Sequence, residues 1–416
     1  MSADLSFCNG QPASQSSAVS QSSAVNQDKV ESYLGHSSSE LQQQGAYWTA
    51  REISQQPQIW QQIANEHQHR LPALQQFLQP LLTQPNLRII LTGAGTSAYI
   101  GQALAASLQQ QLLPGQQVEA IATTDLVSAP GLYLQSPRPT LLVSYGRSGN
   151  SPESVAAVQL AEQLLPDCQH LIITCNAKGQ LAQFSREQAA RSYLYALPEA
   201  THDQSFAMTS SFSGMYLATK LCFASDLQFV TQQVQSLVQQ GSQLLHDQLA
   251  AIGAQAQTPC KRIVFLGSGP LQAIAREAAL KYLELSAGQI LSYFESPLGF
   301  RHGPKSLVDA DTQLILLQSA DPYTQQYDLD LYAELQRDNL ALRIDMLTMQ
   351  QLTAAAPPAP SCLTDDWLGL LHILWCQTLA CYKSMQLGIA PDNPCPSGQV
   401  NRVVQGVVLH RYEGTA

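Results

Sequence analysis

The chain has 416 residues, of which 45% are hydrophobic and 12% are charged, and its formal net charge is −10 at pH 7. This length suits two globular domains better than one, and an acidic chain without a basic stripe is a poor candidate for binding nucleic acid. No long apolar run or secretory signal is found, so we expect no membrane span. Nine scattered cysteines without a CxxC pair argue against a disulfide framework or a zinc site and favour a reducing cytoplasm.

Residues 1–44 are rich in Ser and Gln and contain too few large apolar side chains to build a core, so we expect a disordered tail there. A helical pattern begins with AYWTAREISQQPQIWQQI. His67 and His69, within this helical region, have a spacing that can bind metal. No carboxylate or cysteine cluster joins them, so a solvated helix is favoured and no metal site is expected.

An internal repeat divides the rest of the chain into two halves. RIILTGAG (88–95) and RIVFLGSG (262–269) are each an apolar strand that leads through Gly-x-Gly into a helix. The next apolar strands, in TLLVSYGRSGNS and TQLILLQSADPYT, repeat at nearly the same separation. This pattern predicts an α/β fold of two tandem doubly wound domains, each with a buried parallel sheet in a three-layer αβα arrangement. The expected domains are residues 45–245 (the first half) and 246–416 (the second half).

The loop TGAGTSAYIG (92–101) follows a predicted strand of the first half. It matches G-x-G-x-x-A, the pattern of dinucleotide-binding loops, but a single match of this kind is weak. The alternative is a phosphate cradle, in which Gly95 and the hydroxyls of Thr96 and Ser97 stand at a helix N-terminus.

The loop SYGRSGNSPE (144–153) follows the next predicted strand and favours the phosphate cradle. Its hydroxyls, exposed amides and single guanidinium make a compact site for a phosphate group. The expected contacts are Ser144, Arg147, Ser148, Asn150 and Ser151. The structural alternative is that the serines are helix caps and the glycines only make a turn. The matching loop of the second half, SADPYTQQ, lacks this cluster.

The stretch EAALKYLE (277–284) places Glu277, Lys281 and Glu284 on one helical face. Such a face is usually a solvated ladder of ion pairs. It could also be an acid–base site, and the spacing alone leaves both interpretations open.

GAGTSAYIG, SYGRSGNSPES, EAALKYLE and FRHGPKS together resemble the sugar isomerase (SIS) domain family, and their tandem arrangement resembles the isomerase half of glucosamine-6-phosphate synthase. ESPLGFRHGPKSLVDADT and DNPCPSGQVNRVVQGV resemble the AgaS-type family, described as galactosamine-6-phosphate deaminases or tagatose-6-phosphate ketose/aldose isomerases. We expect no counterpart of the synthase's glutaminase, because residue 2 is Ser and the tail of 44 residues is too short. Release of ammonia is therefore the expected direction.

The resemblance implies a hexosamine or hexose 6-phosphate substrate, an enzyme without a cofactor, and roles for several residues. Glu284 is the expected proton-moving base, and Lys281 and Glu277 would tune it. His302 would open the sugar ring from the neighbouring subunit, which implies a homodimer or a dimer-based tetramer. The expected sugar contacts are Asp203, Ser205 and Ala207, with Asn401 and Arg402 where the synthase has a closing lysine.

Three functions remain compatible with these motifs. The leading hypothesis is conversion of galactosamine 6-phosphate to tagatose 6-phosphate and ammonia, in amino sugar catabolism. A plain aldose–ketose isomerase needs the same base and phosphate cradle. A sugar-phosphate sensor of the same fold needs no acid–base residues, so the retained charges on EAALKYLE argue for an enzyme.

Overall fold

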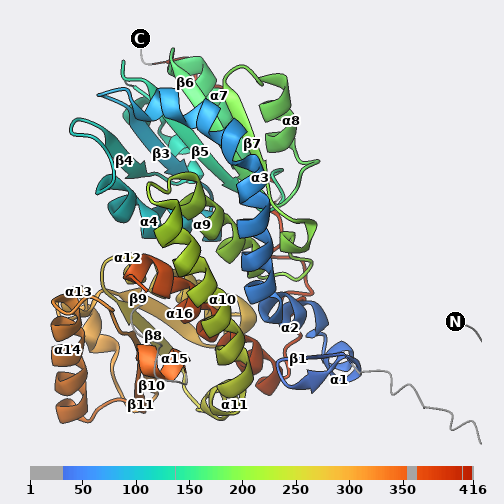
Figure 1. The fold of residues 1–416 in the computed structure, drawn as a ribbon. Coiled ribbons are helices and arrows are strands. Elements are labelled where there is room, and N and C mark those ends of the chain that lie inside the picture. Colours follow the sequence, from blue (N-terminus) through green and yellow to red (C-terminus); the bar gives the residue numbers. More distant parts are fainter. Residues whose placement is uncertain (1–30, 136, 354–362, 405, 415–416) are drawn as a thin grey trace, which may run out of the picture. The chain divides into compact units, whose positions relative to one another are not determined.

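The computed structural model describes residues 31–135, 137–353, 363–404 and 406–414, and from Ser32 onward the chain forms one compact unit (Figure 1). The predicted disordered tail, 1–44, lies outside these ranges up to residue 30. It is wrong for the remainder, where β1 (Ser32–Tyr33), β2 (His36–Ser37) and α1 (Ser38–Gln43) form. Leu34 and Leu41 are buried, and Ser37 and Glu40 make a capping box that starts α1. These local signals outweigh the polar composition of the segment.

Two parallel sheets confirm the predicted α/β class. In the first sheet the strand order is β4-β3-β5-β6-β7, and in the second it is β11-β10-β8-β9. In each sheet, the strand that comes first in the sequence, β3 or β8, has the next strand on one side and the strand after that on its other side. This reversal of direction is typical of doubly wound sheets. The strands are β3 (Arg88–Thr92), β4 (Gln117–Ala120), β5 (Thr140–Gly146), β6 (Cys168–Thr174), β7 (Ser192–Ala196), β8 (Arg262–Gly267), β9 (Leu291–Glu295), β10 (Thr312–Leu317) and β11 (Arg343–Leu347).

The repeat extends to backbone angles. Gly95 has φ 54° and ψ −127°, and Gly269, 174 residues later in the numbering, has φ 54° and ψ −126°. Both glycines precede a helix, and the left-handed φ favours glycine at this position. The two halves therefore turn from strand to helix in the same way.

Helices cover both faces of each sheet (Figure 1). Helix α4 of the first half packs against α12 of the second half, and α16 packs along α12 with most of its side chains buried. The bounds are α2 (Tyr47–Ser54), α3 (Gln56–Leu82), α4 (Thr96–Gln109), α5 (Thr123–Ser128), α6 (Pro130–Tyr133), α7 (Pro152–Leu164), α8 (Gln180–Glu187), η1 (Glu199–Thr201), α9 (Ser210–Cys222), α10 (Leu227–Asp247), α11 (Leu249–Ala256), α12 (Pro270–Leu285), α13 (Pro297–Phe300), η2 (Pro304–Leu307), α14 (Thr324–Asp338), α15 (Met349–Thr353) and α16 (Asp365–Gln386).

The contact between α4 and α12 includes a pair of equivalent positions. The guanidinium of Arg276 donates to the side-chain carbonyl of Gln102 at 3.0 Å, and these residues also stand 174 apart in the numbering. The same guanidinium lies over the rings of Tyr99 and Phe294. The contact thus lies where the two halves meet.

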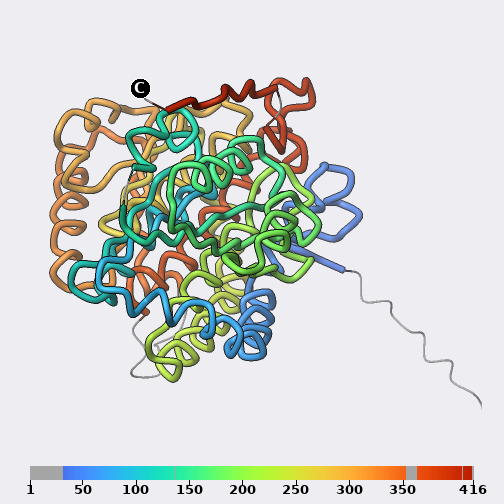
Figure 2. The backbone as a smooth tube through the Cα atoms, turned by 90° about the horizontal axis from the view of Figure 1, so that it is seen from above, coloured from blue at the N-terminus to red at the C-terminus, as the bar shows by residue number. Residues whose placement is uncertain are grey.

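The predicted boundary between residues 245 and 246 falls inside α10, which packs against both α3 and α16. The division into two domains therefore stays a prediction. After α16 the described chain contains no further helix or strand, and Figure 2 shows this segment as an irregular dark-red trace along one edge. Across the described ranges, no helix combines the length and apolar character needed to cross a membrane.

The turn after β8 predicts a matched pair of stability effects. A Cβ at Gly267 would lie 2.7 Å from the carbonyl carbon of Leu271, whereas one at Gly253 of α11 would meet only the Tyr382 ring at 3.6 Å. We expect Gly267→Ala to lower the free energy of unfolding by about 1–3 kcal/mol, since the helix start would have to move. Gly253→Ala should raise it by about 0.5–1 kcal/mol or leave it unchanged. Urea unfolding of both variants measures this, and equal effects would contradict the close approach of Gly267 to the backbone of Leu271 in α12.

Candidate active site

A cavity of about 320 Å³ lies at the carboxyl ends of β3 and β5, where the strand order of the first sheet reverses. Ligands of open α/β sheets bind at this position. Five segments far apart in the sequence line the cavity: the two predicted loops of the first half, the loop 202–209, the C-terminal part of α12 and the segment 400–404. The lining residues are Ala94, Gly95, Thr96, Ser97, Tyr99, Tyr145, Gly146, Arg147, Ser148, Ser151, Ser154, Phe206, Met208, Leu280, Lys281, Glu284, Val400, Asn401, Arg402, Val403 and Val404.

The first loop reaches the cavity through Gly95, Thr96 and Ser97. Gly95 immediately precedes α4, and the two hydroxyl residues occupy its first turn. The helix dipole and the hydroxyls make this end of α4 attractive to an anion. All three residues of this loop that were predicted to contact a phosphate therefore line the cavity.

The second loop brings Arg147, Ser148 and Ser151 to the cavity. Ser151 precedes α7, yet its side chain makes no capping hydrogen bond, so the interpretation of this serine as a helix cap does not hold. The other two predicted contacts lie elsewhere. Ser144 is buried within β5, and the Asn150 side chain accepts a hydrogen bond from the Gln180 amide at the start of α8.

Arg147 has a role that the sequence did not reveal. Its guanidinium donates to the carbonyl oxygens of Phe206 at 3.0 Å and Arg402 at 2.6 Å. It therefore fastens two chain segments to the second loop while it lines the cavity. Burial lowers the pKa of the Arg147 guanidinium, and the nearby charge of Arg402 acts in the same direction.

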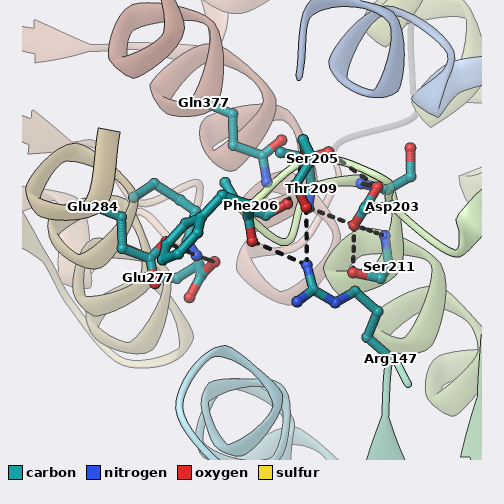
Figure 3. A network of polar contacts seen from close by, with 12 residues as sticks. Arg147, Asp203, Ser205, Phe206, Thr209, Ser211, Glu277, Glu284 and Gln377 are labelled. Carbon is teal, nitrogen blue, oxygen red and sulfur yellow. Dashed lines mark hydrogen bonds and ion pairs between the residues drawn. The ribbon is translucent and has the colours of Figure 1, made fainter. Parts of the chain in front are cut away.

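The charged face of α12 is not a solvated ladder. Lys281 and Glu277 are almost fully buried, at 1% and 0% side-chain exposure, and only Glu284 is partly exposed, at 23%. The Lys281 ammonium lies 2.5 Å from Oε2 of Glu284 and 3.6 Å from Oε1 of Glu277 (Figure 3 labels the two glutamates). Because Lys281 and Glu284 line the cavity, this face can take part in proton transfer.

Glu277 lies behind the two cavity residues in an environment that disfavours its charge. Neither of its oxygens has a hydrogen-bond partner among the described residues. Burial raises the pKa of Glu277 to about 8, and Lys281 acts against this effect. Burial alone would lower the pKa of Lys281, but Glu277 and Glu284 raise it overall. The lysine is thus held in its charged form between the two carboxylates.

His302 is exposed on the turn between α13 and η2, and it does not line the cavity of its own chain. Its neighbours Arg301 and Lys305 form ion pairs with Glu334 of α14. Whether His302 reaches a site therefore depends on a second chain, and its catalytic role stays a prediction.

The predicted sugar contacts of the loop 202–209 need correction. Asp203, Ser205 and Ala207 are fully buried and do not line the cavity. Instead, the alternate residues Phe206 and Met208 face it. The Asp203 carboxylate accepts hydrogen bonds from the backbone amides at the start of α9, which are those of Thr209, Ser210 and Ser211. Asn401 and Arg402, the other predicted sugar contacts, do line the cavity.

The corresponding position in the second half is filled by the protein itself. The Asp328 carboxylate accepts hydrogen bonds from the Ser268 hydroxyl and the Ser319 amide, both at 2.9 Å. Asp365 accepts from the Ser319 hydroxyl and the Ala320 amide, both at 2.6 Å. Two side-chain anions thus bind the groups that would otherwise be offered to a ligand.

Several cavity residues gave no signal in the sequence, namely Tyr99, Tyr145, Ser154, Leu280, Phe206, Met208, Val400, Val403 and Val404. Most are apolar or aromatic and are indistinguishable from core residues by pattern. The described ranges contain no group of three or more His, Cys, Asp or Glu side chains that could hold a metal ion. His67 differs from the expected solvated histidine, because it is buried and its Nδ1 lies 3.1 Å from the Tyr195 hydroxyl.

The buried carboxylate predicts how stability depends on pH. A carboxyl whose pKa rises from 4.5 to about 8 on folding contributes stability that is full below pH 4.5 and is lost as pH rises through 8. We expect Glu277→Gln to remove this loss. The melting temperature of the variant should therefore increase relative to that of the wild type as pH rises from 4.5 to about 8. Glu334→Gln is the control, because ion pairs with Lys305 and Arg301 lower the pKa of that carboxyl. Parallel pH curves for wild type and Glu277→Gln would contradict the prediction.

Comparisons with known proteins agree with this geometry. The chain matches the SIS domain family over residues 81–225 and 258–356. It is 58% identical to D-galactosamine-6-phosphate deaminase AgaS of Shewanella sp. (strain ANA-3), over 90% of this chain and 95% of that protein. It is 45% identical to the Escherichia coli protein of the same name, over 88% and 96%. The crystal structure of tagatose-6-phosphate ketose/aldose isomerase from E. coli superimposes with a TM-score of 0.77 at 41% identity, over 88% and 97%. The chain therefore belongs to the SIS domain family and, within it, to the AgaS-type proteins.

Proposed function

We propose that this chain is a deaminating isomerase that converts D-galactosamine 6-phosphate and water to D-tagatose 6-phosphate and ammonia. One observation carries the proposal: the same cavity is lined by a hydroxyl-bearing helix start and by the Lys281–Glu284 pair. The first suits a phosphate group and the second suits proton transfer. The names of the relatives at 58% and 45% identity support this choice of substrate.

The phosphate would bind between the two loops of the first half. Thr96 and Ser97 offer hydroxyls in the first turn of α4, and Ser148 and Ser151 offer hydroxyls from the second loop. Ser144 and Asn150 are left out of this proposal because of their positions. The guanidinium of Arg147 adds positive charge nearby while holding the surrounding segments.

The reaction would then proceed on the opened sugar. A base removes the proton from C2, giving an enolamine in which C1 carries the hydroxyl and C2 carries the nitrogen. Return of a proton to C1 gives a C2 imine, and water adds to C2 so that ammonia leaves and the ketone of tagatose 6-phosphate forms. Glu284 is positioned to move the proton between C2 and C1, because its carboxylate is at the cavity and partly exposed.

Lys281 would serve two purposes beside that base. Its ammonium can stabilise negative charge that develops on O1 during proton removal. It also holds the Glu284 carboxylate in place, since the two groups are 2.5 Å apart. Glu277 stays behind Lys281 and acts on it electrostatically rather than on the substrate.

A plain tagatose-6-phosphate ketose/aldose isomerase is the second candidate. The E. coli structure at 41% identity, which bears that enzyme's name, favours it. Such an isomerase would use the same base and phosphate site without loss of nitrogen. A non-catalytic sensor would need neither Lys281 nor Glu284 at the cavity.

Replacement of the base gives the direct test. Glu284→Gln should lower kcat for ammonia release from galactosamine 6-phosphate by about a thousandfold, because a glutamine cannot accept the C2 proton. Glu162→Gln is a matched control, since Glu162 is also partly exposed, at 21%, and ion-paired, in that case with Arg191. It should leave kcat unchanged.

The substrate panel separates the candidates. Glucosamine 6-phosphate and N-acetylgalactosamine 6-phosphate are assayed alongside, with ammonia as the readout. Conversion of tagatose 6-phosphate to an aldose phosphate without any ammonia would replace the deaminase by the plain isomerase. Silence in both assays with intact sugar-phosphate binding would leave the sensor.

We further propose a homodimer, or a tetramer built from it, in which His302 of the partner subunit opens the sugar ring. Support comes from the exposure of His302 and from its absence among the residues that line the cavity of its own chain. The cytoplasm is the proposed location, because a sugar phosphate is the substrate and the seven cysteines of the described ranges are free thiols.

Co-expression of two inactive variants tests the shared site. In a mixed dimer of His302→Ala and Glu284→Gln chains, one of the two sites would keep both groups. Random pairing should therefore restore about a quarter of the wild-type activity. Each variant alone is the control and should be nearly inactive. Failure of the mixture to recover activity, with dimers present, would place His302 in the site of its own chain, and an active His302→Ala variant would place it outside the reaction.

A further inference from the structure

The segment before residue 81 lies outside the matched SIS domain ranges, yet it contacts a loop of the cavity. Glu52 of α2 is 3% exposed, and its carboxylate accepts hydrogen bonds from the backbone amides of Gln204 and Ser205. The Ser205 hydroxyl donates to the same carboxylate at 2.5 Å. One side chain outside the residues that match the family model thus accepts hydrogen bonds from three donors on two consecutive residues of the loop 202–209.

Other groups hold the same loop from different sides. Arg147 binds the carbonyl of Phe206 from the second loop (Figure 3), and Arg402 binds the carbonyl of Asp203. The Phe206 amide donates to the carbonyl of Asp392 at 3.2 Å. The loop 202–209 is therefore held by hydrogen bonds from three sides: the loop 144–153, the C-terminal segment and α2.

Asp392 joins the last two of these supports. Its carboxylate accepts hydrogen bonds from the Trp48 amide at 3.0 Å and the Thr49 amide at 2.7 Å, in the first turn of α2. An acidic group at a helix start is stabilised by the unpaired amides there. The contact fixes the position of α2, and with it Glu52, relative to the C-terminal segment.

The side chains of the loop that face the cavity are apolar and make no hydrogen bonds that would fix them. Phe206 and Met208 line the cavity with apolar side chains. Their positions therefore depend on the backbone contacts on either side. Glu52 binds two backbone amides and the Ser205 hydroxyl, and loss of its carboxylate would leave buried donors without this partner, which is costly.

The environment of Glu52 is unfavourable for a charge. Burial raises the pKa of Glu52 to about 8, and the neighbouring carboxylate of Asp203 acts in the same direction. A buried carboxylate close to another one reduces stability unless its hydrogen bonds offset the cost. The hydrogen bonds of Glu52 to Gln204 and Ser205 offset this cost.

We propose that Glu52 is a positioning residue of the sugar site. It fixes residues 204–208 so that Phe206 and Met208 contact the carbon skeleton of the ligand. The phosphate group is held separately, by Thr96, Ser97 and the serines of the second loop. The inference rests on the proposed function only in taking a hexose 6-phosphate as the ligand.

The separation of the two parts of the ligand makes the proposal testable by binding alone. Galactitol 6-phosphate, which has no carbonyl to react, and inorganic phosphate are titrated calorimetrically into the full-length protein. For Glu52→Gln and Glu52→Ala, affinity for the hexitol phosphate should fall by about tenfold or more, while affinity for inorganic phosphate should change by less than about twofold. In turnover assays the same loss should raise KM more than it lowers kcat.

Asp328→Asn is the matched control. Asp328 is also a fully buried carboxylate, and it accepts hydrogen bonds from a hydroxyl and a backbone amide in the second half. Its replacement should lower the melting temperature without changing either affinity. Ser205→Ala removes a single donor and should give a smaller loss for the hexitol phosphate. The effects of Ser205→Ala and Glu52→Gln should not add, because the two groups contact each other.

Two results would overturn the proposal. One is an equal loss of affinity for both ligands in a folded Glu52 variant, and the other is unchanged affinity for both. If neither Glu52 variant folds, Ser205→Ala decides by the same comparison. The two proposals can fail separately. If the Glu52 variants lose affinity for the hexitol phosphate as expected but the wild-type protein releases no ammonia, the deaminase activity is rejected and this inference stands.

Discussion

The packing of α12 against α4 is the constraint on which the site depends. It brings the charged face of α12 in the second half to the loops 92–101 and 144–153 of the first half, so neither half forms the cavity alone. Within this contact Lys281 is buried between Glu277 and Glu284. A buried ammonium needs opposite charge close by, and the Glu284 carboxylate, 2.5 Å from the Lys281 ammonium, supplies it. The pairing keeps the lysine charged and orients the Glu284 carboxylate at the cavity wall.

The two halves share the backbone geometry of the turn from strand to helix but differ in the side chains at that turn. Gly95 and Gly269 have nearly the same dihedral angles. However, hydroxyl residues follow Gly95, while Pro270 and Leu271 follow Gly269. In the second half, Asp328 and Asp365 satisfy the donors that a phosphate would need. In the described ranges, the crevice of the first half is thus open at the strand reversal, and that of the second half is closed by its own carboxylates.

The repeated strand–Gly-x-Gly motif predicted the sheets and the crevice, because buried strands and positive-φ glycines leave a strong local pattern. The burial of Lys281 could not be predicted from EAALKYLE, since only the packing of α16 and α4 decides which face is covered. The loop 202–209 was predicted in the wrong phase, because its direction is set by distant partners such as Glu52. No periodic pattern marks such contacts, and the capped helix at Ser38–Gln43 was hidden by polar composition.

The Arg276–Gln102 hydrogen bond has an evolutionary meaning. The two residues are equivalent in the duplicated sequence and contact each other where the two halves meet. In a symmetric dimer of identical single domains, a residue that contacts its own equivalent faces an identical side chain, so an arginine would face an arginine. Fusion of the duplicated domains into one chain removes this restriction. Each position can then change independently, and complementary residues can replace self-paired ones along the whole seam.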